Sequence, residues 1–176
     1  TVLYLEGDTQ YVYRILRSVK NRFGALSEIG VFDMEDKGLV EVKNPSELFL
    51  EGRFTGASGS IVTPIIEGSR SFLVEVQALV TKTVFGYPLR KASGFDNNRL
   101  QVLLAVLGKR TKIYFDQFDV HVNVVGGLTL KEPASDLAVC LALVSAHKNI
   151  SLPSDLIACG EVGLAGEIRS VVKMKE

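Results

Sequence analysis

The chain has 176 residues, of which 47% are hydrophobic and 23% are charged, a composition typical of a soluble globular protein with one or two hydrophobic cores. Twenty basic residues balance twenty acidic ones, so overall charge does not direct the protein to nucleic acid, and only a local basic face would serve that purpose. The longest apolar runs are too short to cross a bilayer, which excludes a transmembrane helix and a membrane partner.

The N-terminal residues predict a small group of strands. Val2–Glu6 and Tyr11–Val19 alternate apolar with polar residues, as half-buried strands do. The segment from Ile29 to Val42 predicts a hairpin, with its turn at Asp36-Lys37-Gly38.

A short helix and then a glycine- and serine-rich stretch follow these strands in the chain. The string NPSELFL predicts one helical turn, with Asn44 as its cap and Pro45 at its first position. The next ten residues, EGRFTGASGS from Glu51 to Ser60, are rich in glycine and serine. They predict a linker or domain boundary.

The second half of the chain mixes strands with helices. Two strands flank the turn Glu67-Gly68-Ser69, and NNRLQVLLAVLGKR predicts an amphipathic helix that ends at Gly108. FDVHVNVVGG predicts a strand that enters a double-glycine loop. A helix from Pro133 to about His147 follows, and DLIACGEVGLAGEIRSV then predicts a strand and a tight hairpin. Elements in this order predict an α/β (α+β) fold.

The sequence begins within one predicted secondary-structure element and ends within another. The sequence opens within a strand pattern, TVLYLEGD, and stops within a helical pattern, VVKMKE. We therefore expect a piece of a longer protein, with its second domain truncated at the C-terminus.

The string GKRT, from Gly108 to Thr111, has the appearance of the end of a phosphate-binding loop. The glycine required earlier in such a loop falls on Leu103, and the string follows a helix instead of a strand. GKRT therefore predicts a helix C-terminus with basic side chains placed against the helix dipole. The chain contains no complete nucleotide site.

No combination of side chains predicts a metal site or an acid–base pair. Cys140 and Cys159 lie in apolar strings without ligand spacing, which favours free thiols in a reducing cytoplasm. His121 lies in a predicted strand and His147 at a predicted helix end, far apart in the sequence, so we expect structural roles. The carboxylates show no spacing distinctive of acid–base catalysis.

The string VKNRFG is the most specific motif in the N-terminal part. With its surroundings, YRILRSVKNRFG, EIGVFDM and NPSE, it resembles the end of the RecA-like ATPase core of the bacterial RadA (Sms) DNA repair proteins. The resemblance implies that the motif acts at a ring interface, near nucleotide held by a neighbouring subunit, and couples ATP to DNA handling. A cation delivered in this way stabilises charge on a transferring phosphoryl group. The motif residues are Lys20, Asn21, Arg22, Phe23 and Gly24.

The remainder of the chain resembles the Lon protease-like domain that follows the ATPase core in this family. The strings that carry this resemblance are GFDNNRLQVLLAVLGKR, VNVVGGLTLKEPASDLAVCLALVSA and ACGEVGLAGEIRSV. It implies two domains, with residues 1–52 finishing the RecA-like core and residues 53–176 forming a Lon-like domain.

Active Lon-type peptidases use a serine–lysine dyad, with the serine in a GPSAG-like string at a helix start. Aligned on the proline, that string places Ala134 at the nucleophile position and leaves Ser135 one residue later, about 100° round the helix. A methyl group cannot attack a carbonyl, so the resemblance implies a proteolytically inactive domain. It places Lys175 on the dyad lysine, and we expect Ser135 and Asp136 to satisfy backbone N–H groups in the first turn.

Basic residues around the predicted helix of the second domain are candidates for phosphate contacts. The alternative is an ordinary solvated helix flank, and the resemblance favours DNA. Asn97, Asn98 and Lys112 accompany the set. The candidate DNA-binding residues are Arg90, Lys91, Arg99, Lys109 and Arg110.

The resemblance implies a cytoplasmic, ATP-driven motor that promotes branch migration of recombination intermediates. Its implied partners are single- and double-stranded DNA, a recombinase filament and further copies of itself in a hexamer. ATP, magnesium and a structural zinc are implied for the N-terminal part of such a protein, and no cofactor is implied for this chain, which lacks the phosphate-binding loop. Two alternatives stay open: an active Ser-Lys peptidase, and an oligomerisation scaffold that does not touch DNA.

Overall fold

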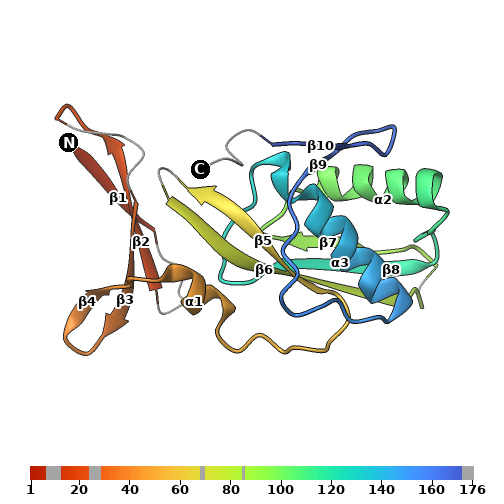
Figure 1. Cartoon of the computed structure of the whole chain (residues 1–176), viewed down its shortest axis with the longest axis horizontal. Helices are drawn as coiled ribbons and strands as arrows, with labels where there is room; N and C mark the ends of the chain where they lie inside the picture. Colours follow the sequence, from red (N-terminus) through yellow and green to blue (C-terminus); the bar gives the residue numbers. More distant parts are fainter. Residues whose placement is uncertain (7–12, 24–28, 68–69, 85, 172–176) are drawn as a thin grey trace.

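The computed structural model describes residues 1–6, 13–23, 29–67, 70–84 and 86–171, and within them it contains two four-stranded sheets and a short two-stranded one (Figure 1). The mixed α/β class predicted from the sequence is confirmed. The elements in chain order are β1 (Val2–Glu6), β2 (Tyr13–Lys20), β3 (Ile29–Glu35), β4 (Gly38–Glu41), α1 (Pro45–Leu50), β5 (Ser60–Glu67), β6 (Arg70–Lys82), β7 (Arg90–Ser93), α2 (Asn97–Thr111), β8 (Phe118–Val124), η1 (Pro133–Ser135), α3 (Asp136–Lys148), β9 (Glu161–Val162) and β10 (Ile168–Arg169).

The first sheet is an antiparallel meander in the order β1-β2-β3-β4. The predicted hairpin is confirmed, because Glu35 pairs with Gly38 across the turn. Gly38 has a φ of 107°, a backbone conformation that residues with a Cβ rarely adopt. The strand predicted from Tyr11 is described from Tyr13 onward.

Helix α1 joins the first sheet to the second through one aromatic side chain. Phe49 is buried, and its ring contacts the rings of Tyr13 and Phe72 edge-on, at centroid distances of 5.2 and 6.1 Å. Pro45 is the first helical residue, as predicted. Asn44 precedes it, as predicted, but the prediction that its side chain caps the helix is wrong. The side chain donates to Glu47 Oε1 instead.

The glycine- and serine-rich stretch after α1 is tied to the second sheet by a buried charged cluster. Arg53 Nε donates to Ser60 Oγ (3.1 Å), and that hydroxyl donates to the buried Glu75 (2.5 Å). Arg53 Nη1 also donates to the carbonyl of Ser154 (2.6 Å). The stretch predicted as a linker therefore has defined contacts near both of its ends, at Arg53 and at Ser60. The domain division at residues 52 and 53 stays a prediction.

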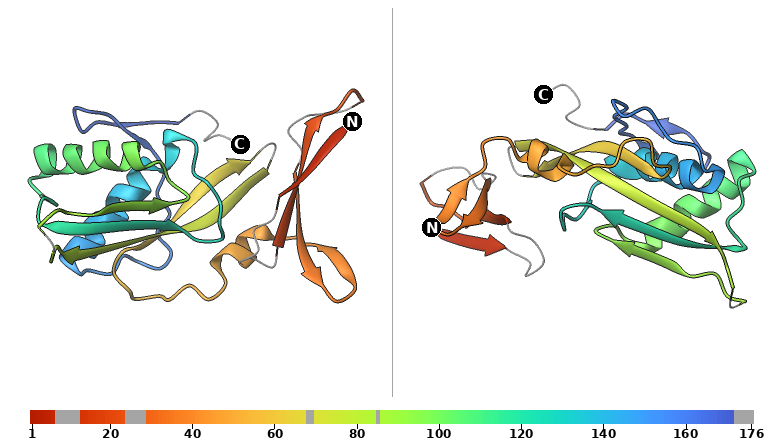
Figure 2. Two further views of the ribbon diagram at one scale, coloured as in Figure 1. Left: turned by 180° about the vertical axis from the view of Figure 1, so that it is seen from behind. Right: turned by 90° about the horizontal axis from the view of Figure 1, so that it is seen from below.

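The second sheet has the order β5-β6-β8-β7, in which only the β7–β8 pair is parallel. Its buried face includes Val74, Val76 and Val122, and α2 and α3 lie over this side (Figure 2). Alternate residues of a strand point to opposite faces, which explains why Gln77 and Leu79 are exposed on the other side.

The sequence predicted that helix α2 ends at Gly108, and this is wrong. The helix continues to Thr111 and ends where Lys112 adopts a left-handed φ of 60°. A glycine inside a helix costs about 1 kcal/mol relative to alanine. Its presence has a packing reason here, because a Cβ on Gly108 would lie 3.3 Å from the ring of Tyr114. GKRT lies in the last turn, as predicted.

The predicted helix from Pro133 to about His147 is confirmed, with a short 3-10 turn, η1, before α3. The predicted C-terminal hairpin is also present, as β9 paired with β10. Within the described ranges, no helix combines the length and apolar content that crossing a membrane requires.

Candidate functional site

The start of α3, where the sequence places a peptidase nucleophile position, is fastened to the segment before β9. The carbonyl of Ala134 accepts a hydrogen bond from Gly160 N (2.7 Å), and Leu137 N donates to the carbonyl of Gly160 (3.1 Å). Two reciprocal bonds of this kind fix the position of the helix start. The half-buried methyl group of Ala134 lies on η1 and provides no nucleophile.

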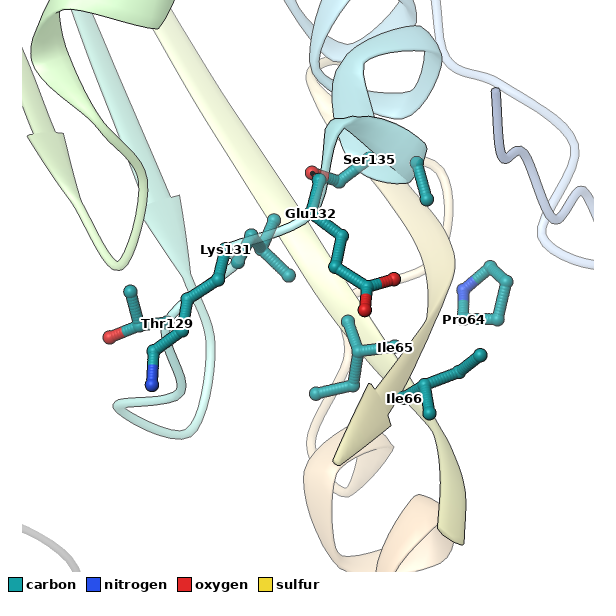
Figure 3. Close-up of a pocket in the computed structure, with 9 residues that line it drawn as sticks. Pro64, Ile65, Ile66, Thr129, Lys131, Glu132 and Ser135 are labelled. Atoms are coloured by element: carbon teal, nitrogen blue, oxygen red, sulfur yellow. Dashed lines mark hydrogen bonds between the residues drawn. The ribbon is translucent and has the colours of Figure 1, made fainter. Parts of the chain in front are cut away.

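A hollow of about 230 Å³ is lined in part by Ala134. It lies between η1 and β5 (Figure 3). Ile65 and Ile66 line it from β5, and the side chain of Glu132 extends toward them. Ser135 also lines this hollow but is only 2% exposed. Its Oγ donates to the carbonyl of Glu132 (3.2 Å).

The hydrogen bond of Ser135 corrects the expectation that this serine satisfies a backbone N–H group. The 3-10 turn brings the Glu132 carbonyl within reach of both the hydroxyl and the backbone N–H of Ser135. The hydroxyl therefore acts as a donor to the backbone, and the side chain does not cap α3. Lys175, the predicted dyad lysine, lies outside the described residues, as do Val172 and Lys173.

Asp136 connects three segments through a buried ion pair. Its side chain is fully buried, and its two carboxylate oxygens accept from Nε (3.0 Å) and Nη2 of Arg99. Oδ2 also accepts from Val162 N (3.2 Å), and Arg99 Nη2 donates to the carbonyl of Val162 (2.9 Å). The hydrogen bond to Asp136 raises the pKa of Arg99.

This ion pair revises two expectations from the sequence. Asp136 does satisfy a backbone N–H group. That group is the N–H of Val162 in β9, and not one in the first turn of α3. The guanidinium of Arg99 donates hydrogen bonds to the buried carboxylate of Asp136, so these donors are not available to a phosphate. Cys140, one turn further along α3, is a buried free thiol, and burial raises its pKa to about 12, which makes the thiolate inaccessible at neutral pH.

Arg90 is engaged internally as well. Its guanidinium donates to the carbonyls of Phe115 (2.7 Å), Leu89 (3.0 Å) and Phe118. Partial burial lowers its pKa, although Asp119 and Asp116 act in the opposite direction. These contacts attach the start of β7 to the chain that enters β8.

The remaining predicted DNA-binding residues do not form one patch. Arg110 donates to the carbonyl of Leu164 at 3.3 Å, from the last turn of α2 to the loop between β9 and β10. Lys91 and Lys109 are exposed, and we find no ion pair for either among the described residues. Lys109 and Arg90 line one hollow, whereas Lys91, the next residue after Arg90 in β7, points to the other face of the sheet.

The described part of the KNRFG motif forms a turn at the end of β2. Asn21 Oδ1 accepts from Phe23 N (3.1 Å), and also from the hydroxyl of Thr1 (3.2 Å). The Arg22 guanidinium lies 5.9 Å from the centroid of the Phe23 ring, which is 86% exposed. Lys20 is exposed at the strand end, and Gly24 lies outside the described residues.

The histidines and other candidate ligands form no metal centre in the part of the chain that the structure covers. No group of three His, Cys, Asp or Glu side chains there is placed to hold a metal ion. His147 instead packs against the rings of Phe115 and Phe118, at centroid distances of 5.0 and 4.7 Å.

Sequence reasoning missed one residue that the structure makes conspicuous. Tyr114 follows the basic string GKRTK by one residue, and its ring lines the same hollow as Lys109. An aromatic side chain beside a run of cations would have been the signal, because this combination is typical of single-stranded nucleic-acid sites.

Comparison with known proteins gives two results. The family model described as "Lon protease (S16) C-terminal proteolytic domain" matches residues 102–176. The chain is also similar over its whole length to proteins named "DNA repair protein RadA". The identity is 47% to that of Halalkalibacterium halodurans over 176 residues, 49% to that of Listeria monocytogenes over 176 residues and 48% to that of Bacillus subtilis over 177 residues. The chain spans 38% of the length of each of these relatives.

Proposed function

This chain corresponds over its whole length to the C-terminal part of the RadA family of bacterial DNA repair proteins, and from that relationship we propose that it is a DNA-binding, ring-forming module without peptidase activity. The observation that carries the proposal is the identity of 47–49% over the entire chain. The methyl group of Ala134 at the helix start, beside a serine whose hydroxyl donates to the backbone, supports the absence of peptidase chemistry.

The proposal includes the two domains expected from the sequence, residues 1–52 and 53–176. The side chains of β1 support it, because four consecutive apolar residues, Val2 to Leu5, are all about half exposed. Consecutive strand residues point to opposite faces, so both faces of β1 present apolar surface. Strands of this type are normally covered on both sides inside a larger α/β sheet, such as that of an ATPase core.

For the whole protein we propose an ATP-driven motor in the bacterial cytoplasm that promotes branch migration of recombination intermediates as a hexamer, together with a recombinase filament. Nucleotide and magnesium would be held by the ATPase core, and a structural zinc by the part before it. This chain would contribute Lys20 and Arg22 toward a neighbouring subunit's nucleotide. Their place on an exposed turn shaped by Asn21 supports that role, since a cation delivered between subunits must project from the surface.

For DNA, we propose Lys109 as the phosphate contact from the predicted set, because Lys91 points to the other face of the sheet and cannot join it on one duplex. Arg90 and Arg99 are engaged with carbonyls and a carboxylate, so their replacement would alter the fold as well as the charge. Arg110 bonds a loop carbonyl only at 3.3 Å and keeps an exposed side chain, so it adds to the positive potential.

We expect Lys109→Ala to weaken binding to duplex DNA without changing thermal stability. Each phosphate contact contributes about 0.9 to the slope of log K against log salt, so loss of this contact should reduce that slope by about 0.9. Fluorescence anisotropy of a labelled duplex, measured at several salt concentrations, gives both quantities.

Lys37→Ala is the matched control, because Lys37 is an equally exposed lysine in the β3–β4 turn, away from the second sheet. Its slope should equal that of the natural chain. If the natural chain does not bind duplex even at low salt, the oligomerisation-scaffold alternative is correct for this region.

We expect neither the natural chain nor Ala134→Ser to react with a serine-directed fluorophosphonate or to cleave casein. A hydroxyl at position 134 would still need a general base at the correct distance, and a displacement of about 1 Å can cost on the order of a hundredfold in rate. In-gel fluorescence and mass spectrometry of the labelled residue measure this directly. Ser135→Ala is the control for background labelling. Labelling of the natural chain at Ser135 would establish the peptidase alternative.

A further inference from the structure

A second hollow, which we call the α2 hollow, lies at the C-terminal end of α2 and has a volume of about 450 Å³. Tyr114 and Phe115 line it from the segment after the helix, and Gln101 lines it from the helix itself. Phe115 is buried and contributes apolar surface, whereas Gln101 is exposed and offers an amide donor and acceptor. The size and lining suit a planar, partly polar group such as a nucleobase.

The ring of Tyr114 is held in place and yet accessible. It is 57% exposed, and it lies so close to Gly108 that a Cβ there would be 3.3 Å from Cδ1. The glycine inside α2 therefore allows an aromatic ring to rest on the helix while much of its surface faces solvent. A ring that is already fixed loses little side-chain entropy when a ligand stacks on it.

The charges around the α2 hollow favour an anionic ligand. Lys109 and the guanidinium of Arg90 line it, and Lys112 is exposed at the end of α2. Asp116 is the one carboxylate among the lining residues in the described part of the chain. Arg90 is held by three carbonyls, so it contributes positive potential, while the two lysines are the groups placed to contact phosphate.

We propose that the α2 hollow binds an unpaired base of a single DNA strand, stacked on Tyr114, with the adjoining phosphates on Lys109 and Lys112. This inference rests on the proposed function and adds strand selectivity to it. In a duplex each base is already stacked between its neighbours, so its face is not available to Tyr114. Stacking on an aromatic side chain is largely independent of sequence, because every base has a π face.

The test uses binding of a labelled thymidine oligonucleotide of about 12 nucleotides, a length within the site sizes of single-strand binding proteins. Tyr114→Ala should weaken this binding about tenfold, the size expected for loss of one stacked base, and should leave duplex affinity unchanged. Tyr87→Ala is the matched control, since Tyr87 is 92% exposed and does not line the α2 hollow. It should bind both DNAs like the natural chain.

A second measurement reports stacking itself. The chain has five tyrosines and no tryptophan, so its intrinsic fluorescence comes from tyrosine. The oligonucleotide should quench part of this fluorescence in the natural chain. Tyr114→Phe should keep the affinity, because its ring still stacks, and should lose that part of the quenching. Gly108→Ala, which displaces the ring by a few tenths of an ångström, should weaken single-strand binding and retain the duplex affinity.

The outcomes separate this inference from the function on which it rests. Equal single-strand affinity for Tyr114→Ala and the natural chain, with duplex binding intact, would overturn the stacking site and leave the DNA-binding proposal standing. Competition by free thymidine monophosphate at the same concentration as the oligonucleotide would also overturn it, since it would identify a free-nucleotide site. Absence of binding to either DNA would contradict the proposed function itself.

Discussion

Asp136→Ala should lower the free energy of unfolding by about 3–5 kcal/mol, which is the usual cost of breaking a buried ion pair by removing one partner. The substitution leaves the Arg99 guanidinium without its carboxylate and Val162 N without its acceptor. Because about 1 kcal/mol shifts the midpoint of thermal unfolding by roughly 2–4 °C in a chain of this size, the midpoint should fall by about 6–20 °C. Circular dichroism during heating measures it.

The control for this prediction is Glu167→Ala, which removes one partner of an exposed ion pair. Arg169 and Glu167 are in contact at 2.5 Å, but their side chains are 62% and 38% exposed. Exposed pairs contribute little to stability because solvent screens them, so this variant should unfold within a few degrees of the natural chain. Equal midpoints for Asp136→Ala and Glu167→Ala would show that the buried pair does not hold α2, α3 and β9 together.

Gly94→Ala should destabilise the fold by about 2–5 kcal/mol, for two additive reasons. The φ of Gly94 is 73°, and a residue with a Cβ pays about 1–2 kcal/mol in this region. An added Cβ would also lie 2.4 Å from the carbonyl oxygen of Leu128 and 2.7 Å from Cβ of Val124, so the backbone must move, at a cost of about 1–3 kcal/mol. Urea unfolding measures the difference.

Gly86→Ala separates the two reasons. Gly86 has a similar φ of 79°, but nothing lies within 4 Å of an added Cβ there. This variant should therefore show only the backbone cost of about 1–2 kcal/mol. If both variants lose the same stability, the close approach of the Leu128 segment to Gly94 contributes nothing.

Both predicted losses concern residues that position the start of α3. Gly94 accepts a hydrogen bond from Leu130 N (2.8 Å), which orients the chain that leads into η1. Asp136 then binds the end of that segment to Arg99 of α2 and to β9. The helix start that carries Ala134, at the nucleophile position of active peptidases, is thus connected to α2 and to β9. Such connections suit a module retained for its shape.

Local sequence patterns determined most of the elements. Strands and helices have periods of two and 3.6 residues, and these periods are visible in Phe118–Val124 and in the run from Asn97 to Thr111. Turn residues with positive φ, such as Gly38, predicted the first hairpin for the same local reason. The strings around Lys20 and Pro133 carried the family resemblance, because they are contiguous in the chain.

Only the tertiary structure decided which side chains are free to act. Arg99 meets Asp136 across 37 residues of sequence, and Arg90 meets Phe118 across 28, so neither partner belongs to a local pattern. The same holds for the glycine expected to end α2, which stays helical and lies close to the Tyr114 ring. Any basic residue in the sequence is a candidate for contact with DNA phosphate. In the folded protein, some of these residues bind a carboxylate or carbonyl of the chain instead. The physical reason is desolvation, because a buried charge without a partner destabilises the fold by several kcal/mol.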